Sequence, residues 1–137
     1  MVRENVELIR RTLEVFNRVG ASGDLTELVQ VQREFADPAI EYTPAVEGLR
    51  ICGHEDLLDY WQRWFEPWSE VRWDIEEVVD AGEQVLAVLM IVARGKGSGI
   101  ELTQRVFPVF DFRDGKVVRG HEYLRRDEAL EAVGLRE

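Results

Sequence analysis

An alternating pattern of apolar and polar residues on both sides of a turn signal dominates residues 101–124. Runs of β-branched and aromatic residues flank a three-residue loop that ends in Gly115, which predicts a long β-hairpin. This loop pairs Val106 with Glu122. Alternation then assigns Leu102, Gln104, Val106, Pro108, Phe110, Val118, Gly120, Glu122 and Leu124 to one face, and Arg105, Phe107, Val109, Asp111, Val117, Arg119, His121 and Tyr123 to the other. Both faces are largely apolar, so each is expected to meet protein or ligand.

The periodicity of the remaining chain predicts helices before a meander of strands. Apolar residues recur at helical spacing over 3–19, after a capping-box pattern at 24–27, over 54–65 and after Arg126, while 40–42, 71–76 and 85–92 have the character of strands. A loop at 95–99 places Met90 opposite Gln104 and brings Arg94 to the same inner face. This order predicts one α+β domain spanning 1–137, in which a curved antiparallel sheet wraps the N-terminal helices and leaves a conical cavity. Pro108 supports the curvature, because a proline in a strand is expected at an edge or a bulge.

Charge and cysteine usage narrow the possible partners. The net charge is −10, and no basic stripe is present, which argues against nucleic acid or an anionic membrane surface as a partner. No apolar run reaches membrane-spanning length, and no signal peptide is evident. The single cysteine, Cys52, has no partner for an internal disulfide and suits a reducing cytoplasm. Neither it nor His54 and His121 forms a metal-ligand pattern, so we expect no metal and no cofactor.

Three segments carry a resemblance to a known family: "FADPAIEYTP" after the second helix, "GHEDLLDYWQRW" at the third, and "FRDGKVVRGHEYLRRDEAL" at the end. The whole chain resembles the SnoaL-like branch of the nuclear transport factor 2-like (NTF2-like) superfamily, a cystatin-like, cone-shaped α+β barrel. The resemblance implies the same fold and a homodimer. It does not single out a reaction, since this superfamily includes isomerases, dehydratases, hydrolases, cyclases and non-catalytic binding domains.

The resemblance also bears on individual residues. Steroid isomerases of this fold carry an aspartate, a tyrosine and a cavity-facing acid at positions where this chain has Thr43, Phe16 and Pro108, respectively. Relatives that act as epoxide hydrolases and cyclases often use an acid on the last strands. Glu122 is the carboxylate that the predicted pairing places on the inner face of the final hairpin, so it is the candidate general acid or base.

Several side chains are candidates for binding a ligand beside Glu122. Gln104 is expected to orient the ligand as a diagonal neighbour of Glu122 across the hairpin. The predicted apolar walls and further ligand contacts are Trp61, Trp73, Met90, Val106, Tyr60 and Arg94. The tryptophans either line the pocket or fill the core, and Arg94 either binds an anionic ligand or pairs with Glu41 or Glu122.

Two classes of function remain open. One is an enzyme that acts on a small, largely apolar molecule as a cofactor-independent isomerase, hydrolase or cyclase through general acid/base chemistry. The other is a non-catalytic ligand-binding domain or a dimeric assembly domain. The face that carries Phe107, Val109 and Tyr123 is too apolar to be left in water, which predicts a homodimer packed through it.

Overall fold

A computed structural model describes residues 2–45 and 48–135. Within these ranges the helices are α1 (Val2–Ser22), α2 (Thr26–Phe35), α3 (Gly53–Phe65) and α4 (Arg126–Ala132). The strands are β1 (Ala36–Thr43), β2 (Ile51–Cys52), β3 (Trp68–Ala81), β4 (Gln84–Gly95), β5 (Glu101–Arg113) and β6 (Lys116–Tyr123). None of the helices in the described ranges is long and apolar enough to cross a membrane.

The sequence signals at the start of α2 are only partly used as predicted. The Asp24 carboxylate accepts a hydrogen bond of 3.0 Å from the Thr26 backbone N–H, which satisfies one of the free donors of the first turn. Glu27 does not reach back to complete a capping box. Its carboxylate instead forms an ion pair of 2.7 Å with Arg18 of α1.

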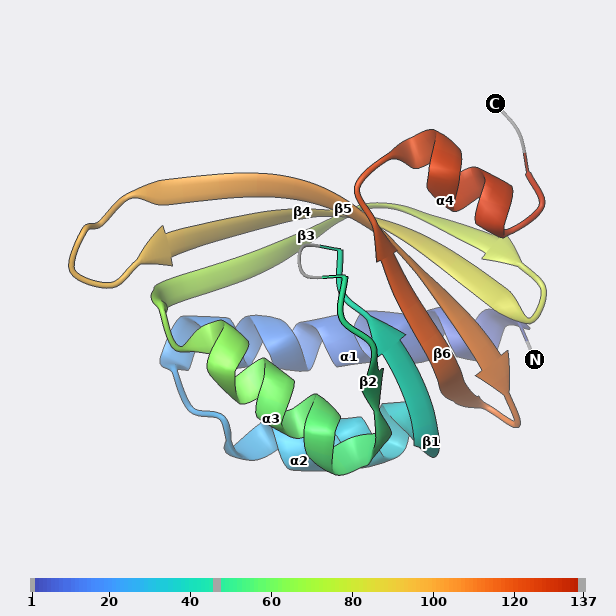
Figure 1. Ribbon diagram of the computed structural model, residues 1–137, viewed down its shortest axis with the longest axis horizontal. Helices are drawn as coiled ribbons and strands as arrows, with labels where there is room; N and C mark the ends of the chain where they lie inside the picture. The colour runs from blue at the N-terminus through green and yellow to red at the C-terminus, as the bar shows by residue number, and fades with distance from the viewer. Residues whose placement is uncertain (1, 46–47, 136–137) are drawn as a thin grey trace.

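The six strands form one curved, unclosed sheet in the order β2-β1-β6-β5-β4-β3. Neighbouring strands run antiparallel except β1 and β6, which pair in parallel. Figure 1 shows α1, α2 and α3 on the concave side of the sheet and α4 on the opposite side. The predicted α+β architecture is confirmed, and the main hydrophobic core lies between the concave face and the first three helices.

The β5–β6 hairpin departs from the predicted pairing in two places. Its turn has two residues rather than three, with positive φ at Asp114 (52°) and Gly115 (78°), as a type I′ turn requires. A β-bulge then leaves Val118 without a partner, between the pairs Phe112–Val117 and Asp111–Arg119. The shorter turn and the bulge each shift the predicted pairing by one residue. The total shift of two residues keeps Glu122 on the inner face, because side chains alternate between the faces. Only Val117, which is buried in the core, changes to the inner face.

The β4–β5 hairpin departs by a single residue, and here the assignment of faces reverses. The Gly95 N–H donates to the Ile100 carbonyl at 2.9 Å, which shortens the loop by one residue. Arg94 consequently pairs with Glu101, and Met90 with Arg105. Because successive side chains in a strand point to opposite faces, Met90 and Arg94 lie on the convex face rather than the concave one.

Pro108 occupies a central strand, so its predicted place at an edge or a bulge is wrong. It pairs with Glu122 of β6 on one side. On the other side, the β4–β5 pairing is interrupted between Leu86–Val109 and Leu89–Val106. Proline has no N–H to donate, so the interruption coincides with the position at which the ladder lacks a donor.

The convex face is less exposed than the sequence pattern suggests. Phe107 and Val109 are buried against Ala129 and Leu130 of α4. These two side chains are kept from water as predicted, but by the chain's own last helix rather than by a partner subunit. Around this covered patch, ion pairs such as Arg105–Glu76 (2.6 Å) line the surface.

The segment between Thr43 and Gly53 holds one further strand. Ile51 and Cys52 form β2, which pairs antiparallel with β1 through Glu41 and Tyr42. Residues 46–47 of this loop lie outside the described ranges.

Candidate functional site

Two hollows meet on the concave side of the sheet. The inner one is a largely apolar cavity of about 70 Å³ between α1, α3 and the sheet, and the outer one is a wider basin of about 700 Å³. Four residues line both: Trp64, Ile91, Val106 and Glu122. The basin therefore continues into the cavity, and Glu122 stands at the boundary between them.

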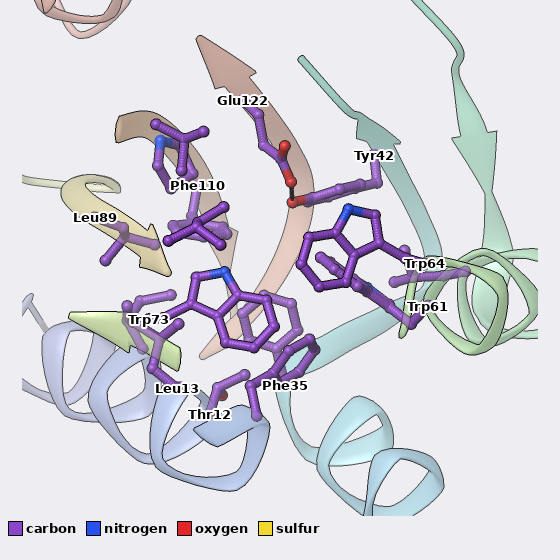
Figure 2. Close-up of a pocket in the computed structure, with 16 residues that line it drawn as sticks. Thr12, Leu13, Phe35, Tyr42, Trp61, Trp64, Trp73, Leu89, Phe110 and Glu122 are labelled. Atoms are coloured by element: carbon purple, nitrogen blue, oxygen red, sulfur yellow. Dashed lines mark hydrogen bonds between the residues drawn. The ribbon is translucent and has the colours of Figure 1, made fainter. Parts of the chain in front are cut away.

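Glu122 reaches this boundary from β6, where it shares the inner face with Gly120. The Tyr42 hydroxyl donates to Oε2 of Glu122 (Figure 2). The Ala45 backbone N–H donates to Oε1 at 3.4 Å. Burial raises the pKa of Glu122, and the two hydrogen bonds partly oppose this rise because they favour the carboxylate. Within residues 2–45 and 48–135, no cationic side chain forms an ion pair with Glu122.

Tyr42 is a side chain of the candidate site that the sequence reasoning missed. It is 5% exposed, and its partner Glu122 is 80 residues further along the chain. Parallel pairing places Tyr42 beside Gly120, two residues before Glu122. Burial, followed by the charge of Glu122, raises the pKa of the Tyr42 phenol well above its ordinary value, so the phenol stays protonated and remains a donor. The available signal was strand alternation, since Tyr42 shares a face with the buried Ile40.

Aromatic side chains from α1, α3 and β3 form one part of the cavity wall. Trp61 meets Phe16 edge-on at 4.9 Å between ring centroids, and Trp64 lies 5.3 Å from Trp73. The same rings belong to or pack on the hydrophobic core, so the tryptophans serve as both core and wall. In the view of Figure 2, Trp61, Trp64 and Trp73 lie below Glu122. The resulting surroundings are apolar, with a carboxyl and a phenol as the principal polar groups.

The predicted ligand contacts divide into three groups: four side chains that line a hollow, the exposed Gln104, and two side chains that lie outside both hollows. Trp61 and Trp73 line the inner cavity, Val106 lines both hollows, and Tyr60 lines the basin. Gln104 also lines the basin, but it is exposed and donates to the Arg105 carbonyl at 3.0 Å.

The predicted neighbour relationship of Gln104 is wrong. Glu122 pairs with Pro108, which lies four residues from Gln104 along β5, so the two side chains are not diagonal neighbours. Val106 takes the diagonal position instead.

Met90 and Arg94 form the third group, and their predicted place in the cavity is wrong. The one-residue register difference puts both on the convex face, where Arg94 forms an ion pair of 3.6 Å with Glu101. The side chains of β4 that face the concave side here are Leu89, Ile91 and Ala93, and each of them lines at least one of the two hollows.

The positions that correspond to catalytic groups of steroid isomerases have different environments. Phe16 and Pro108 both line the inner cavity. Thr43 pairs with His121 and follows the inward-facing Tyr42, so it lies on the convex side of the strand. Among the described residues, no group of three or more His, Cys, Asp or Glu side chains is arranged to hold a metal ion.

Comparisons with known proteins agree on the fold. A family model described as SnoaL-like domain matches residues 9–120. AclR from Streptomyces galilaeus superposes with a TM-score of 0.73 at 15% identity, covering 98% of each chain. A protein from a Jannaschia species, classed as a SnoaL-like polyketide cyclase, superposes with a TM-score of 0.71 at 18% identity, covering 88% of this chain and 85% of its own.

A further solved structure has the same fold with a ligand. This protein from Catenulispora acidiphila has a ketosteroid isomerase-like fold and is in complex with trimethylamine; it superposes with a TM-score of 0.68 at 16% identity, covering 90% of this chain and 92% of its own. No significant sequence match to a curated protein is found. At these identities the structural likeness concerns the fold alone.

Proposed function

Because the chain belongs to the SnoaL-like domain family, we propose that it binds a small, largely apolar molecule in the basin and inner cavity and exchanges a proton with it through Glu122. The observation that carries this proposal is a half-buried carboxyl at the junction of the two hollows, held by Tyr42 and Ala45. A carboxyl whose pKa is raised by apolar surroundings both takes and returns a proton nearer neutral pH than an exposed one.

The sizes of the hollows restrict how a ligand is seated. Small-molecule sites are commonly about 300–1,000 Å³. The basin, at about 700 Å³, falls in that range, whereas the inner cavity of about 70 Å³ takes only a small group. The body of the ligand would rest against Tyr60, Trp64 and Trp68 in the basin. A small apolar end would enter the inner cavity, and a polar or acidic group would face Glu122.

Proton exchange at a carbon beside a carbonyl group suits this arrangement. The Glu122 carboxylate removes the proton while the electron pair of the broken C–H bond moves toward the carbonyl oxygen. The protonated Glu122 then returns the proton, either at the same carbon or at a second one. When the enolate is conjugated with a C=C bond, return of the proton at a second carbon gives an isomerisation. Attack of the enolate on a second carbonyl carbon of the same molecule gives a cyclisation: a C–C bond forms, the attacked C=O becomes an alkoxide, and the protonated Glu122 gives its proton to that oxygen. The likeness to a structure classed as a polyketide cyclase supports the second possibility.

The test is proton exchange in deuterated water. Apolar ketones, polyketide-like diketones, lactones and epoxides would be incubated with the protein, with deuterium incorporation and product formation followed by mass spectrometry. Wild type should exchange or convert at least one compound, and Glu122→Gln should abolish that activity. Glu101→Gln is the matched control, because Glu101 pairs with Arg94 on the convex side and should be dispensable. Full turnover by Glu122→Gln would refute the assigned role.

A non-catalytic binding role is the second candidate. The observation that favours it is the Glu122 carboxyl, which has no cationic partner in the described ranges and bonds to Tyr42. The Tyr42 ring in turn packs against Tyr60 and Trp61. A bound alkylammonium would supply the missing positive charge and meet aromatic surfaces. The related fold bound to trimethylamine supports this alternative. Saturable binding of trimethylamine that Glu122→Gln removes, together with no deuterium exchange in any compound, would favour it over catalysis.

Homodimerisation through the convex face is a separate proposal, restricted by α4 to the surface that this helix leaves open. Met90 and Val92 are only half-buried there, and His121 stacks on Tyr123 at 4.2 Å between ring centroids. A symmetric contact would use this patch on both subunits. Light scattering at micromolar concentration should give twice the chain mass of 15.9 kDa, and a mass of one chain would refute the proposal.

A further inference from the structure

A glycine on β6 occupies the position over which the Tyr42 ring lies. Gly120 pairs with Tyr42 of β1 on one side and with Phe110 of β5 on the other, so the three form one row across the sheet. A Cβ atom at position 120 would lie 2.6 Å from Cδ1 and 2.8 Å from Cε1 of Tyr42. Such distances are shorter than carbon atoms tolerate, so the Tyr42 ring fills the space that any other side chain at 120 would need.

We propose that Gly120 is a positioning residue for the site: by leaving this space to the Tyr42 ring, it allows the Tyr42 hydroxyl to hold the carboxyl of Glu122. The proposal rests on the functional role proposed above for Glu122. It goes beyond that role, because Gly120 itself has no side chain to meet a ligand and acts only through Tyr42.

The strand spacing explains why the space is needed at this position. Gly120 and Glu122 are two residues apart, which is roughly 6.6 Å along a strand, and both face the concave side. The Tyr42 side chain starts beside Gly120 and ends with its hydroxyl at Glu122, as Figure 2 shows for the labelled pair. The ring must therefore pass over the position of Gly120 to make this hydrogen bond.

The surroundings leave the ring little freedom to move aside. Its other neighbours are Trp61 at 5.9 Å and Tyr60 at 6.4 Å between ring centroids, both from α3. A methyl group at position 120 would push Tyr42 toward these two side chains. The displacement would draw the hydroxyl away from Glu122 and narrow the hollows that Tyr60 and Trp61 line.

Backbone conformation does not account for the glycine. Gly120 is absent from the glycines with positive φ, so its backbone is one that alanine adopts readily. The predicted effect of Gly120→Ala is therefore steric and passes through Tyr42. Gly95→Ala is the matched control, since Gly95 also lies in a strand without a positive φ and its added methyl would meet only the Ser98 side chain within about 3 Å.

The decisive measurement is the titration of Glu122 in protein carrying ¹³C-labelled glutamate, with its resonance assigned from Glu122→Gln. Tyr42→Phe should shift the titration to higher pH, because the lost hydrogen bond favours the carboxylate. Gly120→Ala should shift it in the same direction, and the double variant should move little further than Tyr42→Phe alone. Gly95→Ala should titrate as wild type. A folded Gly120→Ala protein with wild-type titration of Glu122 would overturn the proposal.

A second comparison applies if Gly120→Ala is too unstable to titrate. In the wild-type background the methyl group should lower the thermal midpoint by about 3–10 °C, as overpacking in a core does. In a Tyr42→Ala background, which lacks the ring, the loss should largely disappear. Equal losses in both backgrounds would refute the role of Tyr42. Neither measurement requires a ligand, so a failed search for proton exchange would count against the proposed function and leave the inference on Gly120 standing.

Discussion

Replacing Tyr42 with phenylalanine removes one oxygen atom from the interior and leaves Glu122 without its phenol donor. Tyr42 is 5% exposed, so water does not readily take the place of its hydroxyl. A hydrogen bond to an ionised group contributes roughly 1.5–3 kcal/mol, and one between neutral groups roughly 0.5–1.5 kcal/mol. Tyr42→Phe should therefore lower the free energy of unfolding by about 1.5–3 kcal/mol where Glu122 is ionised, and by less where it is protonated.

The pH dependence follows from the direction of the pKa shift. Burial raises the pKa of Glu122 in the folded protein, and the Tyr42 bond opposes that rise. A carboxyl with a raised folded pKa contributes stability below its unfolded pKa, and this contribution is lost as the pH rises through the folded value. Removing the Tyr42 donor raises the folded pKa further. The unfolded state is the same for both proteins, so the destabilisation of Tyr42→Phe should grow as the pH rises from the folded pKa of Glu122 in wild type through its higher folded pKa in the variant.

Urea unfolding followed by tryptophan fluorescence measures this effect, in buffers from about pH 5.5 to about pH 8.5. This range avoids the sequence pI of about 4.7, where the protein carries little net charge. Tyr123→Phe is the matched control, because it removes the same atom from the convex face, and it should change stability by no more than about 0.5 kcal/mol. A loss below about 0.5 kcal/mol for Tyr42→Phe at pH 8 would refute the reasoning, since a buried charged hydrogen bond contributes more.

Three further predictions concern other parts of the structure. Glu122→Gln should unfold at a higher temperature than wild type at about pH 8, because a neutral amide avoids the desolvation of a charge, and it should lose that advantage toward acidic pH. Identical thermal midpoints across the range would contradict a raised pKa of Glu122. Leu130→Ala should destabilise by about 2–5 kcal/mol in urea unfolding, since Leu130 is 7% exposed on the buried face of α4. Leu135→Ala, at a position 41% exposed, should stay within about 0.5 kcal/mol of wild type. A small effect of Leu130→Ala would mean that α4 does not cover the convex face in solution. For any ligand found, Trp64→Ala should weaken binding at least about tenfold in calorimetry and Arg94→Ala should leave it unchanged, since Trp64 lines both hollows that meet at Glu122 and Arg94 lines neither. A large effect of Arg94→Ala would place the ligand elsewhere.

Local periodicity by itself determined the elements and much of the face assignment. Helical spacing located α1, α3 and α4, and alternation within β5 correctly put Val106 on the concave face. These inferences succeed because the direction of a side chain within one element depends only on its position along that element. Glu122 was assigned to the correct face as well, although two one-residue errors in the hairpin had to offset each other for that result.

Relationships between elements were decided by the tertiary structure. The register of β4 against β5 depends on the hydrogen bond that closes the loop at Gly95, and a difference of one residue moved Arg94 to the opposite face. The pair of Tyr42 and Glu122 depends on parallel pairing of strands far apart in the chain, for which neither residue's neighbours in sequence carry a signal. The covering of the convex face by α4 depends on where a short helix packs. The sequence therefore predicted which residues point inward, while packing between distant segments decided which of them meet.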